Sequence, residues 1–278
     1  MSKLYLVGTP IGNLGDLSPR ALEILGKVDF IAAEDTRVSL KLLNHFGIKK
    51  PMVSYYQHNL RERGEQIISR IAAGESCAII TDAGMPCISD PGEDLVALCH
   101  QNNIPMEVVP GPSAVVSALA ISGLPTGRFA FEGFLSVKKA SRLEHLQQIK
   151  SDTRTLIFYE APHKLRATLS DMMQVLGENR RISLCRELTK LHEEAQRMTL
   201  AEAVDLYQTR EPKGEYVLVI EGASLEAIKE EQPTLEEAAQ KVCELAASGI
   251  SLSEAAKTIA ADTGYKKGEL YRLALQQQ

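Results

Sequence analysis

Short apolar segments alternate with helical patterns through the first 110 residues, and this alternation limits the possible folds more than any other feature of the chain. Strands are predicted at residues 4–7, 28–33, 77–81 and 106–109. Ser18 and Pro19 are typical of a helix start and Gly26 of a helix end. Another helix is predicted over residues 63–73, and one more after Gly92. Strands and helices in this order favour parallel α/β units.

The segment Pro110-Gly111-Pro112 is the clearest domain boundary, because two prolines around a glycine cannot continue a strand. A helix is expected to begin near Ser113. A second α/β set follows, with strands at residues 128–134, 155–159, 181–185 and 215–221. A helix over residues 162–176 places leucines and methionines on one face, which we interpret as core and not as a cofactor contact.

After Gly222 the composition shifts to Ala, Glu, Lys and Leu, and the tail is predicted to be wholly helical. Thr234 and Ser251 each precede a glutamate by three residues, which is typical of a capping box. Residues 253–273 have the length of a helix-turn-helix, and a helical hairpin packed on the main body is the alternative. The predicted domains are residues 1–111, 112–224 and 225–278.

Composition narrows the classes of protein that are possible. Hydrophobic residues make up 44% and charged residues 24%, as in an ordinary globular protein, and no segment approaches the roughly 18 apolar residues of a membrane span. The chain starts directly with a strand pattern and not a signal peptide, so a cytoplasmic location is expected. The five cysteines and six histidines are scattered without metal-ligand spacing, and we predict no metal site.

The net charge of −5 argues against indiscriminate coating of nucleic acid, so any RNA contact must be local. Basic residues do cluster in a few places, each of which is more often a solvated surface than a binding site. These clusters are Lys138-Lys139 with Arg142, Lys164 with Arg166, Arg180-Arg181, and Lys266-Lys267.

Two loops follow strands at the edge where open α/β sheets bind ligands. Residues 8–15 hold three glycines but lack both the phosphate-binding lysine motif and the dinucleotide glycine spacing, which weakens ATP and NAD as ligands. In residues 82–92, Gly84 allows a ligand to approach the main chain, the carbonyls of Ala83, Gly84 and Met85 suit a cation, and Ile88 offers an apolar wall. A sulfonium fits such a lining, and a purely structural loop is the alternative.

Several segments together resemble the tetrapyrrole-methylase superfamily: Val7 to Leu14, Ala33-Glu34-Asp35-Thr36-Arg37, Thr81 to Gly92, and Pro110 to Ala114. Others are similar to the family of ribosomal RNA small subunit methyltransferase I: Phe131 to Leu135, Phe158 to Lys164, Arg186 to Lys190, and Lys213 to Gly222. The resemblance covers residues 3–222 in order, and the tail resembles that family's helix-turn-helix-like C-terminal domain.

The resemblance implies two α/β domains of the tetrapyrrole-methylase type (class III methyltransferase) with a small all-helical C-terminal domain, commonly as a homodimer. It implies S-adenosylmethionine as methyl donor and 2′-O-methylation of a cytidine in the decoding centre of 16S rRNA within the small ribosomal subunit. The donor contacts carried over by motif are Pro10, Asp82, Ala83, Gly84, Met85, Ile88, Ser113, Ala114 and Glu160. Met85 stands where the family usually has Thr, and Met198 where it often has Gly, so either side chain would reshape the donor pocket.

A ribose hydroxyl must lose its proton during the reaction, which calls for a base or for a cation near the oxygen. Within the family motifs, Asp35, Glu187 and Lys190 are the catalytic candidates, with Glu34 beside them. Our hypothesis is that Glu187 or Asp35 accepts the proton, while Arg37 or Lys190 holds a phosphate or the oxyanion. Ordinary salt bridges are the alternative for each. Further candidates for RNA contact are His58, Asn59, His163 and Lys164, and each could equally be a hydrogen-bonded loop residue.

Two other functions are compatible with the sequence. One is methylation of a porphyrinoid, a modified protein side chain or another small substrate by a member of the same superfamily. The helical tail and the segment Glu187-Leu188-Thr189-Lys190 speak against it. The other is a ribosome-assembly protein that binds RNA and the donor without turnover. The acidic net charge further predicts a substrate that is a structured ribonucleoprotein surface and not free RNA.

Overall fold

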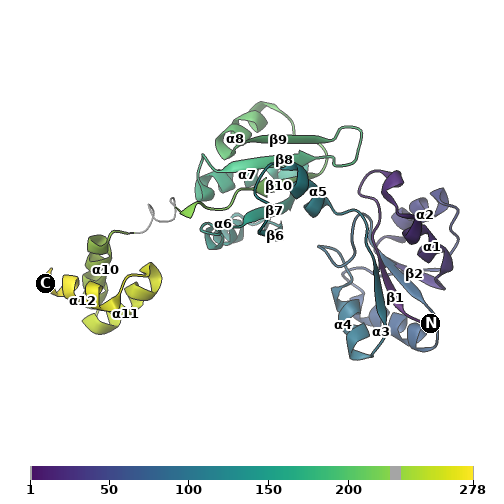
Figure 1. The fold of residues 1–278 in the computed structure, drawn as a ribbon, viewed down its shortest axis with the longest axis horizontal. Coiled ribbons are helices and arrows are strands. Elements are labelled where there is room, and N and C mark those ends of the chain that lie inside the picture. The colour runs from purple at the N-terminus through teal and green to yellow at the C-terminus, as the bar shows by residue number, and fades with distance from the viewer. Residues whose placement is uncertain (1, 226–232, 278) are drawn as a thin grey trace. The chain divides into compact units, whose positions relative to one another are not determined.

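The computed structural model describes residues 2–225 and 233–277. The chain divides into two compact units, Met1–Lys150 with Arg154–Glu221 and Ser151–Thr153 with Gly222–Gln278. The first unit contains two five-stranded sheets, and the second contains the C-terminal helices (Figure 1). The domain bounds given above stay predictions.

The first sheet is wholly parallel, as the alternation of strands and helices predicts. Its strands are β1 (Leu4–Val7), β2 (Phe30–Ala33), β3 (Met52–Ser54), β4 (Cys77–Ile80) and β5 (Met106–Val109), in the order β3-β2-β4-β1-β5. A short 3-10 helix, η1 (Leu14–Asp16), precedes α1 (Pro19–Lys27), and α1 and α2 (Thr36–His45) cover one face. The other face carries α3 (Leu60–Ala72) and α4 (Glu93–Gln101).

β1 and β4 are neighbours in the sheet, but the helices that follow them pack on opposite faces. α1 follows β1 on one face, and α4 follows β4 on the other. Their carboxyl ends therefore form a switch point, where open α/β sheets bind ligands. Two backbone hydrogen bonds join the loops there, from the Thr9 N–H to the Gly84 carbonyl at 2.9 Å and from the Gly84 N–H to the Thr9 carbonyl at 3.1 Å. The loops that follow β1 and β4 are thereby held as one structure.

The second sheet is mixed, with strand order β6-β7-β10-β8-β9. Its strands are β6 (Phe129–Phe134), β7 (Thr155–Glu160), β8 (Arg181–Arg186), β9 (Glu194–Thr199) and β10 (Tyr216–Ile220). β6 and β7 are parallel and the other pairs antiparallel. Helix α5 (Ala114–Ile121) packs on one face, and α6 (Lys139–Gln148), α7 (Pro162–Leu176) and α8 (Leu200–Thr209) pack on the other. Met172 is fully buried and Met173 partly buried in this core, which confirms that the methionines of α7 are core residues.

The C-terminal segment is helical from residue 235 on, as predicted, while residues 226–232 of the predicted helical tail lie outside the described residues. Helices α10 (Leu235–Ala247), α11 (Leu252–Thr263) and α12 (Lys267–Gln276) surround a core of their own that includes Val242, Leu270 and alanines. Thr234 and Glu237 form the full predicted capping box. The second box is half formed, because the Ser251 hydroxyl accepts from the Glu254 N–H without a reciprocal bond. No helix in the described parts of the chain is long and apolar enough to cross a membrane.

A contact between two glycines fixes the start of the loop after β1 against the segment after β5. A Cβ atom at Gly111 would lie 2.8 Å from the Gly8 Cα, and one at Gly8 would lie 2.7 Å from the Gly111 Cα. Both atoms belong to the main chain, so neither position has room for a side chain unless the backbone moves.

We expect Gly111→Ala to lower the free energy of unfolding by about 1–3 kcal/mol, the usual cost of overpacking. The matched control is Gly26→Ala, because Gly26 lies in α1 with no atom within 4 Å of an added Cβ. That substitution is expected to stabilise the protein by about 0.5–1 kcal/mol, since alanine is the better helix former. Urea unfolding of both variants measures the difference, and equal effects would contradict the close main-chain contact.

Candidate active site

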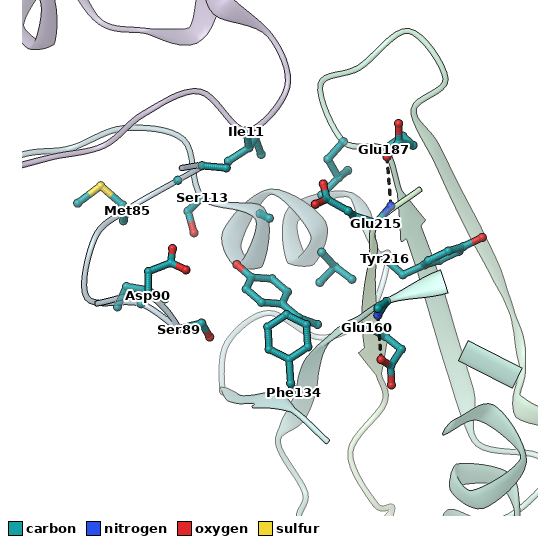
Figure 2. Close-up of a pocket in the computed structure, with 18 of the residues that line it drawn as sticks. Ile11, Met85, Ser89, Asp90, Ser113, Phe134, Glu160, Glu187, Glu215 and Tyr216 are labelled. Carbon is teal, nitrogen blue, oxygen red and sulfur yellow. Dashed lines mark hydrogen bonds between the residues drawn. The ribbon is translucent and has the colours of Figure 1, made fainter. Parts of the chain in front are cut away.

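The loops at the carboxyl ends of β1, β4 and β5 face residues of the second sheet across a cavity of about 420 Å³ (Figure 2). A cavity of this volume is in the range that holds a small organic ligand. One wall is formed by Ile11, residues 83–85 and residues 88–90, and Ser113 and Ala114 continue it at the start of α5. The opposite wall comes from the ends of β6, β7 and β8 and the start of β10.

Glycine and threonine shape the wall that belongs to the first sheet. Gly84 has a φ of +91°, a conformation that favours glycine. The Thr9 hydroxyl is fully buried and donates to the Thr81 carbonyl at 3.1 Å. The main chain of residues 83–85 is thereby held at the cavity wall, while the side chains of Ile11, Met85 and Ile88 make this wall largely apolar.

Asp90 brings a carboxylate into this apolar wall. Burial raises the pKa of Asp90, a hydrogen bond from the Thr81 hydroxyl lowers it, and the neighbouring carboxylates of Glu34 and Asp82 raise it, so that the resulting pKa is about 6. The pKa of Asp82 is also raised, by burial and by Glu34. Glu34 itself accepts a hydrogen bond of 2.7 Å from the Thr81 hydroxyl. This side of the cavity therefore carries concentrated negative charge, which favours a cation nearby.

The segment after β8 holds a lysine between two carboxylates. Lys190 Nζ lies 2.9 Å from Glu187 Oε1 and 3.0 Å from Glu215 Oε2. Burial lowers the pKa of Lys190, but the two carboxylates outweigh it and the net shift is upward. The same ammonium lowers the pKa of Glu187. Lys190 is thus a cation at neutral pH, and Glu187 a carboxylate.

The backbone of this segment is unusual as well. Glu187 and Thr189 both adopt left-handed conformations, with φ of 52° and 65°. Such conformations cost non-glycine residues of order 1–3 kcal/mol each and cluster at functional sites. The loop after β1 approaches closely, because a Cβ at Gly12 would lie 2.5 Å from Lys190 Cγ and 2.9 Å from Thr189 Oγ1. The strained segment and the glycine-rich loop therefore meet at the edge of the cavity.

Glu160 is nearly fully buried where β7 enters α7. Its carboxylate accepts from the Ala161 N–H at 2.8 Å and from the Thr168 hydroxyl at 2.5 Å. These bonds fix the side chain at the first turn of the helix, where the helix dipole favours a negative charge. Glu160 therefore serves at least to orient the start of α7 beside the cavity.

The structure brings many of the residues predicted from the sequence to one place. Those that line the cavity are Ala83, Gly84, Met85, Ile88, Ser113, Ala114, Glu160, Glu187 and Lys190. Those that do not line it are Pro10, Asp35, Arg37, His58, Asn59, Asp82 and Lys164. Their roles in binding or catalysis stay predictions.

Asp35 and Arg37 are bound to each other at the start of α2. The Asp35 carboxylate accepts hydrogen bonds from the Arg37 guanidinium at 2.6 Å and from the Arg37 N–H at 2.8 Å. The guanidinium and the N–H lower the pKa of Asp35 to about 2. A carboxylate with so low a pKa is a weak proton acceptor at neutral pH, which counts against Asp35 as the base.

Asn59 holds the turn that precedes α3. Its amide accepts from the Tyr56 N–H at 2.9 Å and donates to the Ser54 carbonyl at 3.1 Å. The His58 ring lies edge-on to the Tyr56 ring at 6.1 Å. Met198, in β9, packs against the core of the second sheet and does not line the cavity, whereas Met85 does.

The lining residues that received no role from the sequence include Phe134, Asp90, Tyr159 and Glu215. Asp90 belongs to a motif in a strand-to-helix loop, which is a signal that could have found it. Glu215 reaches the cavity because β10 pairs with both β7 and β8, and strand order cannot be read from local sequence. In the described parts of the chain, no three His, Cys, Asp or Glu side chains are grouped to hold a metal ion.

Comparison with known proteins agrees with this architecture. The family described as Tetrapyrrole (Corrin/Porphyrin) Methylases matches residues 3–204, and the family described as RsmI C-terminal HTH domain matches residues 233–278. Among solved structures, a cobalt precorrin-4 methyltransferase of cobalamin biosynthesis aligns with a TM-score of 0.57 at 18% identity. The alignment covers 78% of this chain and 94% of the precorrin-4 methyltransferase chain. The family match places the chain in the tetrapyrrole methylase superfamily, and the fold agrees with it.

Individual proteins with high sequence identity identify the family of this chain more closely. A Synechocystis sp. protein named ribosomal RNA small subunit methyltransferase I is 46% identical over 278 residues, covering 99% of this chain and 98% of the relative. A Thermotoga maritima protein of the same name is 45% identical over 222 residues, which are 80% of this chain and 99% of that protein. The chain belongs to the family of ribosomal RNA small subunit methyltransferase I, and it is a methyltransferase.

The raised pKa of Asp90 predicts a pH-dependent stability. The folded protein binds this proton more tightly than the unfolded chain, so ionisation of Asp90 costs stability as the pH rises from about 4 to about 6. We expect Asp90→Asn to raise the free energy of unfolding by about 1–3 kcal/mol at pH 7 and to have little effect near pH 4. Urea unfolding across this range tests it, with Asp16→Asn, at an exposed position, as the control. A gain that is independent of pH would contradict this account.

Proposed function

We propose that this chain transfers a methyl group from S-adenosylmethionine to the ribose 2′-hydroxyl of a cytidine in the decoding centre of 16S rRNA. One observation carries the proposal: a cavity with an apolar wall and several carboxylates lies at the switch point of a chain whose family is named for methylation of small-subunit ribosomal RNA. We further propose that the substrate is the assembled small subunit, because a net charge of −5 suits a local contact better than binding along free RNA.

The residues of the first wall fit the donor. Gly84, with its left-handed backbone, leaves main-chain groups open to a ligand. Ile11, Met85 and Ile88 suit the apolar parts of the donor, and the carboxylate of Asp90 suits its positive charge. When bound, the donor supplies a methyl group on a cationic sulfur. The other proposed contacts are Pro10, Asp82, Ala83, Ser113, Ala114 and Glu160.

Alignment of the reacting atoms is the main contribution that a protein makes to such a displacement, worth about 7–11 kcal/mol. The ribose oxygen gains the methyl group while its proton passes to a carboxylate. The raised pKa of Asp90, about 6, makes it a better proton acceptor at neutral pH than a carboxylate whose pKa is lowered. Glu187 is the alternative, although the Lys190 ammonium lowers its pKa. Lys190 remains charged and is placed to attract a phosphate or the oxygen that loses its proton.

We also propose that the protein works as a homodimer in the cytoplasm. Val108 on the edge strand β5 and Val116 on α5 are each more than half exposed, and such apolar side chains suit a contact with another subunit. Arg37, His58, Asn59 and Lys164 remain the proposed substrate contacts, with Asp35 bound to Arg37 as a support for that side chain.

Methyl transfer into small subunits from a strain that lacks the gene tests the function. With radiolabelled S-adenosylmethionine, we expect label in 16S rRNA of intact subunits, at the ribose of one cytidine, and a slower reaction on naked 16S rRNA. Label in a porphyrinoid or protein fraction, or donor binding without any transfer, would contradict the proposal. Equal rates on naked RNA and on subunits would overturn only the preference for the assembled particle.

Single-turnover rates identify the proton acceptor. We expect Asp90→Asn to reduce the rate about 10²- to 10⁴-fold, the usual contribution of a general base. Asp16→Asn is the control, because Asp16 is exposed and does not line the cavity, and its rate should stay close to that of the unchanged enzyme. A large loss in Glu187→Gln together with a small one in Asp90→Asn would assign the proton to Glu187 instead.

A further inference from the structure

The cavity includes a large aromatic side chain that neither the donor nor the proton transfer requires. Phe134 ends β6 on the wall formed by the second sheet, and it is 55% exposed. Figure 2 labels it together with Ser89 and Asp90, which line the same cavity from the opposite loop. An aromatic ring exposed at the edge of a cavity offers a flat apolar surface to a ligand.

A β-bulge turns this ring toward the cavity. Phe131 pairs with Ile157 and Phe134 pairs with Tyr159. Between these two pairs β6 therefore contains one residue more than β7. Side chains alternate along a regular strand, and Phe131 and Phe134 would then lie on opposite faces. The extra residue places them on the same face, where both rings contact the Tyr159 ring, at 4.9 and 5.4 Å between centroids.

The bulge depends on Gly133. This residue has a φ of +67°, which favours glycine, and a Cβ there would lie 4.0 Å from the Ser89 hydroxyl across the cavity. Glu132 points to the other face, where it lies 3.0 Å from His145 of α6. Bulges next to active sites commonly redirect one side chain, and here that side chain is Phe134.

A cation lies next to the ring. Lys164, in the first turn of α7, places its Nζ 5.8 Å from the centroid of Phe134. No carboxylate in the described residues pairs with this ammonium. Two other basic residues noted in the sequence are engaged, since Arg142 pairs with Asp171 at 2.6 Å and Arg166 donates to the Tyr207 carbonyl at 2.8 Å. Lys164 is thus available for an anion from outside the protein.

We infer that Phe134 is the stacking surface for the target nucleobase and that Lys164 contacts a phosphate next to it. This inference rests on the proposed function. Proteins that bind unpaired RNA stack its bases on aromatic rings and hold the phosphates with basic side chains. The ring and the cation together distinguish the target from the donor. A nucleotide in RNA has phosphates close to its base, whereas the only anion of the donor is a carboxylate at the end remote from its adenine.

The position of the ring agrees with this assignment. Phe134 and Glu215 are exposed on one wall and Ile88 is exposed on the other, whereas Gly84, Tyr216 and Val217 are buried. A polymer has to enter from solvent and cover the exposed rim, while a small donor can occupy the interior. Phe134 is then a positioning residue, which fixes the base so that its ribose faces the transferred methyl group.

Phe134→Leu tests the inference, because leucine retains apolar bulk without the flat ring, and Phe134→Tyr retains the ring as the matched control. We expect kcat/KM for small subunits to fall about 5- to 150-fold in the leucine variant, the range for loss of one base–aromatic stack. The tyrosine variant should keep most of the activity. Calorimetry with S-adenosylhomocysteine should give the same affinity for all three proteins, since the ring does not hold the donor.

Lys164→Gln should weaken binding to small subunits and reduce its salt dependence by about one phosphate contact. Lys41→Gln, on the exposed face of α2, is the control. A matching loss of S-adenosylhomocysteine affinity in Phe134→Leu would assign the ring to the adenine of the donor and overturn the inference, as would unchanged kinetics. Absence of methylation by the unchanged enzyme would instead overturn the proposed function, and this inference with it.

Discussion

Contacts between main-chain atoms of three loops hold the candidate active site together. The antiparallel bridge from Thr9 to Gly84 joins the loops after β1 and β4, and the contact of Gly8 with Gly111 adds the segment after β5. Because these contacts involve backbone atoms, they fix the loops without using side chains. The side chains of Ile11, Met85, Ile88 and Asp90 are left to determine what the cavity binds.

The carboxylates around the cavity affect the stability of the folded protein differently on its two walls. Carboxylates close to one another and to apolar side chains destabilise the folded state, as the raised pKa values of Asp82 and Asp90 record. On the other wall, Glu187 and Glu215 are stabilised by Lys190. A cationic ligand would relieve the first cost, so binding and folding are linked through the same side chains. Residues arranged for function commonly reduce stability in this way.

Much of the fold could be predicted from the sequence, because the patterns involved are local. The parallel strands, α1, α7 and the helical C-terminal segment follow from periodicity and caps. Periodicity did not predict β3, which has only three residues, or β9, which is an edge strand rich in polar side chains. It also missed α8, although Thr199 and Glu202 form a capping box that is visible in the sequence. Helix α6 starts without a side-chain cap, so it has no comparable signal.

The candidate site was harder to predict than the fold, because it depends on how distant segments meet. Motif resemblance selected Ala83, Gly84, Ser113 and Glu187, which line one cavity. It did not select Phe134, whose orientation depends on one extra residue in β6 that breaks the regular alternation. It did select Asp35, whose carboxylate is occupied by Arg37. Local pattern therefore identified the loops, but the orientation of individual side chains required three-dimensional pairing.

The helices of residues 235–276 surround a core of their own, and every residue that lines the cavity belongs to the α/β unit. The relative from Thermotoga maritima is matched over 99% of its length by 222 residues, so it has no length left for such a helical unit. Because the helices, in the described parts of the chain, share no core cluster with either sheet, a substitution inside their core leaves the packing around the cavity unchanged.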